Sequence, residues 1–204
     1  NYFNSKSENL LPKKKIILGN LIEKLRYGEN PHQEAGIYSY NKELNIKQLN
    51  GKKLSYNNYN DIFSALIISK SLPKNTGTVI IKHANPCGVS INKDKIKSYK
   101  FAFACDPISA FGGIVSCNFK IKKKIALELK KTFLEVVICN GIETEALKIL
   151  KSKKNLRIID ANNLKNANLK NISSSFNAFL LQNTDNFSFS KSNFQVASKM
   201  KPDE

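Results

Sequence analysis

The feature that most restricts the fold of this chain is a regular alternation of short apolar runs and helical patterns between residues 78 and 160. Apolar runs bounded by polar residues are typical of buried strands, and apolar residues at three- or four-residue intervals indicate helices with one buried face. Strands that alternate with helices are joined by crossover connections, so we predict an α/β fold in which a parallel sheet lies between helical layers. The predicted strands are 78–82, 114–117, 136–139 and 156–160, and the predicted helices are 94–104, 120–133 and 144–151, the second with Ile121, Ile125, Leu129 and Phe133 facing the core.

Patterns outside this region are weaker. Apolar residues from Ile16 to Ile22 predict a strand, residues 35–40 predict another, and residues 49–51 predict a turn. Asn60 is predicted to cap a helix whose buried positions are Ile62, Ala65, Leu66 and Ser69. Residues 1–12 are polar and predict a linker, and beyond residue 160 one apolar patch, 176–181, interrupts a polar sequence.

Composition excludes several classes of protein. A chain of 204 residues that is 41% hydrophobic can bury a real core. No stretch approaches the roughly 20 apolar residues of a membrane span, and the first residues lack the order of a signal peptide. Four cysteines without close pairing predict free thiols rather than disulfides or a zinc ribbon. We therefore expect a soluble cytoplasmic protein with no membrane partner.

The formal net charge of +17 is a property that nucleic-acid-binding proteins share. The lysines are spread along the chain, however, and arginine occurs only at Arg26 and Arg157, without an aromatic stacking motif. We therefore favour solvated helix faces and a general attraction for small anions, and expect no nucleic-acid partner. A basic nucleic-acid-binding module remains an alternative.

Lys82 and His83 close the first apolar run and precede a predicted turn through Asn85, Pro86, Cys87 and Gly88. Open α/β folds bind ligands where strands end, so this position favours a functional site. A cation beside an imidazole disfavours the imidazolium form, which leaves a neutral ring that can accept a proton. The alternative is a solvated lysine beside a histidine that bonds a backbone carbonyl.

Two other loops carry polar groups or glycine. Residues 106–113 end in Phe111, Gly112 and Gly113, where adjacent glycines allow a ligand to approach the backbone and Phe111 can stack on a ring. The alternative there is a tight turn with a buried phenylalanine. Residues 51–58 precede a helix, and ordinary capping by Asn57 or Asn58 is the alternative to a binding role.

Four motifs stand in one order along residues 25–157: Arg-Tyr-Gly-Glu-Asn-Pro-His-Gln from 26, Leu-Asn-Gly-Lys with Ser-Tyr-Asn-Asn from 49, Lys-His-Ala-Asn-Pro-Cys-Gly from 82, and Asp-Pro-Ile-Ser-Ala-Phe-Gly-Gly from 106. Together they resemble the transformylase domain of the bifunctional purine biosynthesis family, which joins AICAR formyltransferase to IMP cyclohydrolase. The resemblance implies a domain of two related halves with a cytidine-deaminase-like, layered α-β-α fold. Residues 1–12 are then the tail of the cyclohydrolase domain, and residues 13–204 the N-terminal half of the transformylase domain, truncated at its C-terminus.

The resemblance also implies an activity and a site. Family members transfer the formyl group of 10-formyltetrahydrofolate, a cosubstrate, to the amine of AICAR, and active sites form across a homodimer interface. The full-length protein also closes the ring to IMP. Carried onto this sequence, the catalytic pair is Lys82 and His83, and the substrate-binding residues are Arg26, Tyr27, Asn57, Phe111, Gly112 and Glu135.

The chemistry suits the pair. The AICAR amine is a poor nucleophile because its lone pair is delocalised into the ring, so a base that removes its proton contributes most. His83 is the expected base, and Lys82 is expected to stabilise the oxyanion on the formyl oxygen. His83, Pro86 and Cys87 resemble part of the zinc-deaminase signature, but its Glu and second Cys are absent, so we expect no metal. Cys87 is expected to be a packed residue rather than a nucleophile.

The sequence also departs from the family pattern. Cys139, Asn140 and Gly141 follow a strand after which the family has Ala and Pro, and Asn177 and Ala178 stand where it has glycine. The second half of the domain, which supplies further nucleotide and folate contacts, is not in this sequence. We therefore expect a partial enzyme with little activity by itself, and an inactive fragment that acts only in dimerisation is a further alternative.

Overall fold

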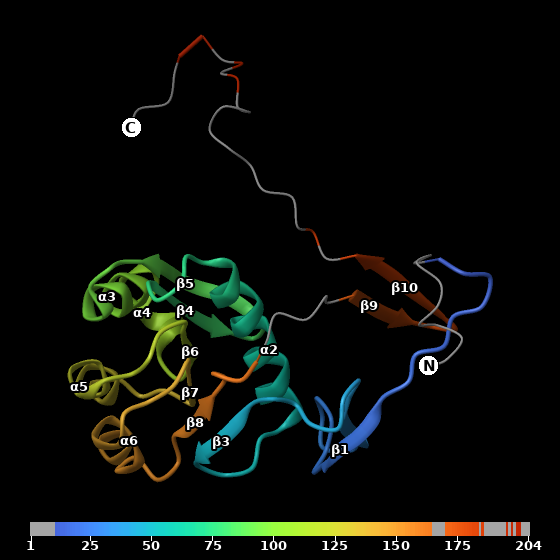
Figure 1. Cartoon of the computed structure of the whole chain (residues 1–204), viewed down its shortest axis with the longest axis horizontal. Coiled ribbons are helices and arrows are strands. Elements are labelled where there is room, and N and C mark those ends of the chain that lie inside the picture. The colour runs from blue at the N-terminus through green and yellow to red at the C-terminus, as the bar shows by residue number, and fades with distance from the viewer. Residues whose placement is uncertain are drawn as a thin grey trace. The chain divides into compact units, whose positions relative to one another are not determined.

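The computed structural model describes residues 11–164 and 170–183, together with residues 185, 195, 197, 199 and 200. The chain divides into two compact units, Asn1–Leu164 and Lys165–Glu204, and each is described by itself. The first unit is built on a six-stranded sheet with the strand order β3-β8-β7-β6-β4-β5 (Figure 1). Its strands are β3 (Lys47–Asn50), β8 (Arg157–Asp160), β7 (Val136–Cys139), β6 (Ile114–Cys117), β4 (Gly77–Lys82) and β5 (Asn85–Ile91).

The predicted parallel sheet is correct for three strands and wrong for the others. β6, β7 and β8 are parallel, whereas β4 is antiparallel to both of its neighbours and β3 is antiparallel to β8. β4 and β5 form a hairpin, and the crossover to β6 starts from β5, so β6 runs antiparallel to β4. The helices α3 (Lys95–Cys105) and α4 (Pro107–Ala110) make this crossover.

Helices cover both faces of the sheet, which confirms the predicted α-β-α layers. α3, α5 (Lys123–Lys131) and α6 (Thr144–Lys151) line one face (Figure 1). α2 (Tyr56–Ser71) covers the other face together with a hairpin of β1 (Asn20–Leu25) and β2 (Ala35–Ser39). None of the helices in the described ranges is long and apolar enough to cross a membrane.

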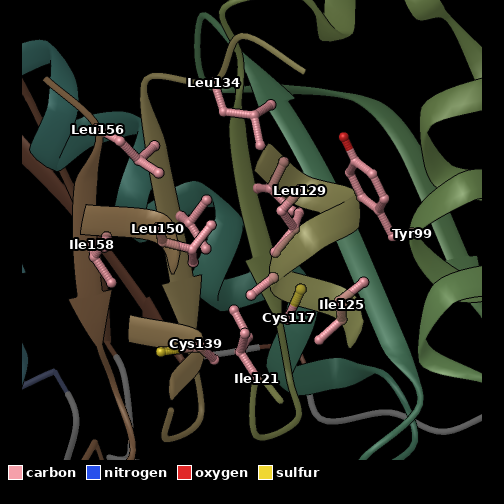
Figure 2. Packing of buried hydrophobic residues seen from close by; sticks show 14 of the residues in the cluster. Tyr99, Cys117, Ile121, Ile125, Leu129, Leu134, Cys139, Leu150, Leu156 and Ile158 are labelled. Carbon is pink, nitrogen blue, oxygen red and sulfur yellow. The ribbon is translucent and has the colours of Figure 1, made fainter. Parts of the chain in front are cut away.

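Alternation along the strands divides the core into two clusters. Val115, Val137 and Ile158 pack under α3, α5 and α6, where Figure 2 shows Ile125, Leu129 and Leu150 against the sheet. Val79, Ile114 and Ile138 are buried on the α2 side. Side chains of successive strand residues point to opposite faces, so runs that are apolar at every position bury both faces.

Several predicted boundaries need correction. The first strand begins at Asn20, which pairs with Ser39 at the end of β2, and Ile16, Ile17 and Leu18 are exposed outside it. The helix assigned to an Asn60 cap begins at Tyr56, because Ser55 and Asn58 form a capping box. α5 ends at Lys131, so Phe133 is not at a helical core position and is 54% exposed.

The second unit contains a β-hairpin that was not predicted from the sequence. Its strands are β9 (Lys170–Ser175) and β10 (Ala178–Asn183), which pair antiparallel. Phe176 lies in the turn with a φ of 54°, and its side chain is exposed. The apolar patch at 176–181 therefore belongs mostly to a strand. The predicted linker at 1–12 lies outside the described residues except for Leu11 and Pro12.

Candidate functional site

The turn between β4 and β5 consists of His83 and Ala84, whose φ angles are 52° and 60°. Two consecutive left-handed residues define a type I′ hairpin turn, which normally uses Asn and Gly. The side-chain carboxylate of Asp61 accepts a hydrogen bond of 2.7 Å from the Ala84 N–H, and the Asn85 amide donates one of 2.8 Å to the His83 carbonyl. Strained backbone of this kind is typical of functional sites.

The predicted turn at residues 85–88 is therefore wrong, because these residues begin β5. Proline is tolerated there, since β5 is an edge strand of the sheet. Gly88 is needed for packing rather than turning, because a Cβ on it would lie 1.9 Å from the carbonyl oxygen of Ala102 in α3. Pro86 and Gly88 are residue types that favour turns, but contacts between distant parts of the chain explain why they occur in β5.

The left-handed turn has a direct consequence for the catalytic pair predicted from sequence. Consecutive residues of a regular strand point to opposite faces of a sheet. Here the backbone leaves the strand conformation at His83, and Lys82 and His83 line one cleft of about 370 Å³ at the end of β4. We call this the strand-end cleft, and its polar lining side chains are Tyr27, Ser55, Asn57, Asn58, Asp61, Lys82, His83, Glu135 and Arg157.

Lys82 is held against the glycine loop that precedes β6. Its ammonium donates hydrogen bonds to the carbonyls of Phe111, at 3.1 Å, and Gly112, at 3.4 Å. Gly112 has a φ of 69°, and its N–H donates to the carbonyl of Phe133 at 2.9 Å. The loop therefore presents carbonyl groups to the cation, and glycine permits the conformation that does so.

The first turn of α2 forms another wall of the cleft. Ser55 accepts a hydrogen bond from the Asn58 N–H, and the Asn58 side chain accepts one from the Ser55 N–H, both at 3.2 Å. The Asn58 side chain also donates to the Glu135 carboxylate at 3.3 Å. One asparagine thus caps the helix and links α2 to the residue before β7, which confirms the capping interpretation for Asn58, while a binding role for this loop stays a prediction.

The structure brings together six of the eight residues predicted for the site: Tyr27, Asn57, Lys82, His83, Gly112 and Glu135 line the strand-end cleft. Arg26 and Phe111 are outside its lining. The Arg26 guanidinium lies 5.7 Å from the centre of the Tyr27 ring, and the Phe111 ring packs against Phe133 at 5.2 Å between ring centres. Phe111 is 60% exposed, which rules out a buried turn phenylalanine. The roles of all eight stay predictions.

The predicted site lacked four of the polar side chains that line the cleft, namely Ser55, Asn58, Asp61 and Arg157. Asp61 had a usable signal, because it lies one helical turn after Asn57 and Asn58 and so shares their face of α2. Arg157 is the first residue of β8 and pairs with Val136, the residue after Glu135, and its N–H donates to the Glu135 carbonyl at 3.1 Å, so the two positions lie at one edge of the sheet.

Cys87 is half-buried, and its thiol donates a 3.6 Å hydrogen bond to the Ile80 carbonyl. Burial raises the pKa of the Cys87 thiol above its ordinary value. Because the thiolate is the nucleophilic form, this environment favours the packed residue that we expected. Within the described ranges, no three His, Cys, Asp or Glu side chains gather to form a metal-binding group.

Comparisons with known proteins agree on one family. A family model described as AICARFT/IMPCHase bienzyme matches residues 1–204. The chain is 40% identical to the bifunctional purine biosynthesis protein PurH of Bacillus cereus strain AH187 and 41% identical to that of strain ATCC 14579, in each case over 88% of this chain. A solved RibD structure from Acinetobacter baumannii has 16% identity and a TM-score of 0.38 over 51% of this chain and 36% of that one, which is too distant to define a fold. The chain spans 36% of the length of these PurH relatives.

Proposed function

The chain belongs to the AICARFT/IMPCHase bienzyme family, and from this premise we propose that it is the first half of a transformylase domain in purine biosynthesis. The reaction is transfer of the formyl group of 10-formyltetrahydrofolate to the amine of AICAR, and the whole protein also closes the product to IMP. The observation that carries the proposal is the strand-end cleft, which gathers Lys82, His83 and Glu135 from separate parts of the chain.

In this mechanism His83 is the general base. As the AICAR amine attacks the formyl carbon, the imidazole accepts the amine proton, and a C–N bond forms. The bond from the formyl carbon to the folate nitrogen then breaks, and that nitrogen takes a proton from the imidazolium. His83 is exposed at the cleft, so its ring is accessible to a substrate.

Lys82 stabilises the negative charge that develops on the formyl oxygen. Its ammonium is oriented by two backbone carbonyls, and none of the ion pairs found in the described residues involves it. A cation without a carboxylate partner keeps its attraction for a developing oxyanion. Preorganisation of this kind needs no movement of the lysine during the reaction.

The remaining site residues hold the substrates. Arg26 and Tyr27, whose guanidinium and ring lie 5.7 Å apart, contact the nucleotide. Asn57 and Glu135 supply further polar contacts, and Phe111 with Gly112 lines the base. The family further supports a homodimer with active sites at its interface and a cytoplasmic location. It also supports residues 1–12 as the end of the cyclohydrolase domain and 13–204 as the first transformylase half.

Calorimetric titration of the 204-residue chain with AICAR tests the proposal. We expect binding that Arg26→Ala weakens by about tenfold, which corresponds to about 1.4 kcal/mol. His83→Asn is expected to weaken it less, because the base acts mainly on the transition state, and Asn tolerates the left-handed turn. His32→Asn, a change at the other histidine, is the matched control and should leave binding unaltered.

Each alternative function predicts a different outcome. A nucleic-acid-binding module binds DNA or RNA with strong salt dependence, and Lys82→Ala barely changes that binding. A fragment that acts only in dimerisation binds neither AICAR nor nucleic acid. The absence of AICAR binding by the folded chain would contradict the proposed function.

A further inference from the structure

A second hollow, which we call the basic cavity, adjoins the strand-end cleft. Its volume is about 440 Å³, and it shares Glu135 and Arg157 with the cleft. The segments before β7 and β8 form its walls, together with Lys52 from the loop before α2. The two hollows therefore meet at these two residues.

The charges that line the basic cavity are strongly unbalanced. The lining contains one carboxylate, that of Glu135, and four cationic side chains, those of Lys52, Lys153, Lys154 and Arg157. Glu135 already accepts a hydrogen bond from Asn58, and no ion pair among the described residues joins it to any of the four cations. Lys153 donates to the Thr132 carbonyl at 2.6 Å and so forms part of the wall. The cavity has the electrostatics of an anion site.

The Arg157 side chain is a second, independent indication of an anion site. Its Nε atom is buried and has no hydrogen-bond partner, and it is the one such side-chain atom in the described part of the chain. The backbone around it is closely packed, because a Cβ on Gly51 would lie 2.8 Å from the Arg157 Cα. The Asn50 amide also donates to the neighbouring Leu156 carbonyl at 2.7 Å. A buried N–H without an acceptor is unfavourable, and an oxygen of a ligand can supply that acceptor.

We infer that the basic cavity binds an oxyanionic group, with Arg157 as its principal donor and Lys52 and Lys154 as supporting cations. Guanidinium groups match the planar geometry of carboxylates and the tetrahedral oxygens of phosphates. The ligand class is a small molecule, since the volume lies in the usual range of about 300–1,000 Å³ for such sites. Two sources have this chemistry, the phosphate monoester of a nucleotide and the glutamate carboxylates of a folate. The choice between them rests on the proposed function, whereas oxyanion binding does not.

The arginine side chains allow a direct test. The chain has two arginines, Arg26 and Arg157, so a ¹H–¹⁵N spectrum of Nε–H groups has two signals to assign. Ribose 5-phosphate and triglutamate are titrated separately into the labelled chain. We expect at least one probe to shift the Arg157 signal in a saturable manner, and the probe that does so at lower concentration identifies the source. Two equal responses indicate a site for either oxyanion, which also supports the inference.

Variants separate a built site from general attraction to a basic protein. Arg157→Gln is expected to weaken calorimetric binding of the effective probe by about tenfold, as for loss of a charge-assisted hydrogen bond. Lys154→Gln is expected to weaken it by about threefold. Lys151→Gln makes the same change of charge on α6, outside the cavity, and should change binding little. If circular dichroism shows that Arg157→Gln is unfolded, Lys52→Gln and Lys154→Gln decide the result.

The inference is overturned if neither probe shifts the Arg157 signal, if ribose 5-phosphate shifts Arg26 alone while triglutamate shifts neither, or if Lys151→Gln weakens binding as much as the cavity variants. The two proposals fail separately. Oxyanion binding through Arg157 without AICAR binding would refute the proposed function alone. AICAR binding with an unresponsive Arg157 would refute the oxyanion site alone.

Discussion

The ammonium of Lys82 donates a 3.1 Å hydrogen bond to the carbonyl of Phe111, which ties the end of β4 to the loop before β6. Carbonyl acceptors orient the cation without neutralising its charge. The same contact sets one wall of the strand-end cleft, because Gly112 follows Phe111 directly. Lys82 therefore has two roles, because it holds the loop before β6 in place and supplies the positive charge proposed for catalysis.

Lys82→Met keeps the aliphatic stem and removes both hydrogen bonds to the loop. We expect the free energy of unfolding of the chain to fall by about 1 kcal/mol, measured by urea denaturation. In a full-length protein containing the same change, formyl transfer is expected to fall by about 10²–10³-fold, because the oxyanion loses its main donor. Lys74→Met, at an exposed position outside the cleft, is the control. Unchanged turnover would exclude Lys82 from the catalytic pair.

Asp61 stabilises the left-handed turn through the Ala84 N–H. Asp61→Ala removes the acceptor, so we expect the free energy of unfolding to fall by about 1–3 kcal/mol. Asp61→Asn retains an oxygen at the same position and should lose less than half as much. Urea denaturation of both variants provides the comparison. Equal losses for the two would show that the hydrogen bond does not hold the turn.

Gly88 and Gly141 illustrate two different requirements for glycine, which are small size at Gly88 and a left-handed backbone at Gly141. A Cβ on Gly88 would overlap the Ala102 carbonyl, so Gly88→Ala is expected to destabilise the fold by about 3 kcal/mol or more. Gly141 has a φ of 91° but open surroundings, with Lys120 at 3.6 Å, so Gly141→Ala should cost only about 1–2 kcal/mol of backbone strain. Thermal unfolding measures both changes. The reverse order would contradict the packing of β5 on α3.

Buried thiols predict a loss of stability at high pH. Burial raises the pKa of Cys117 from 9.0 to about 12. Between these values the unfolded chain releases the thiol proton and the folded chain keeps it, so the free energy of unfolding falls by about 1.4 kcal/mol per pH unit for this group. The stabilisation is fully present below pH 9.0.

Urea denaturation at several pH values above 9.0 measures this slope. Cys117→Ala should flatten it, while Cys105→Ala, which removes an exposed thiol, should not. Burial also raises the pKa of Cys139, so some slope should remain in Cys117→Ala. An identical slope in the wild-type chain and Cys117→Ala would be incompatible with the buried environment of Cys117.

The 204-residue chain alone is expected to formylate AICAR poorly, since it spans only 36% of the length of its PurH relatives. A steady-state assay with 10-formyltetrahydrofolate and AICAR, run beside a full-length family member, provides the comparison. Turnover by the chain at the rate of the full-length protein would show that the strand-end cleft is a complete active site.

Local patterns predicted some elements to the residue. β6, β7 and α6 have their predicted bounds, because each is a short apolar or amphipathic segment between polar residues. Predictions failed where contacts with residues far along the chain determine the local structure. Pro86 and Gly88 are turn-forming types, yet an edge position and the Ala102 carbonyl place them in β5. Phe133 continues a helical spacing, yet the helix ends before it.

The amino-acid order alone determined the layers, the end of β4 and the two ionisable groups delivered there, because apolar periodicity and chain breaks act over a few residues. Tertiary structure decided that His83 leaves the strand in a left-handed turn, that β4 lies antiparallel between β5 and β6, and that Glu135 and Arg157 meet the same cleft. Register and strand order follow from burying both faces of one sheet at once, and that requirement involves residues far apart in the chain.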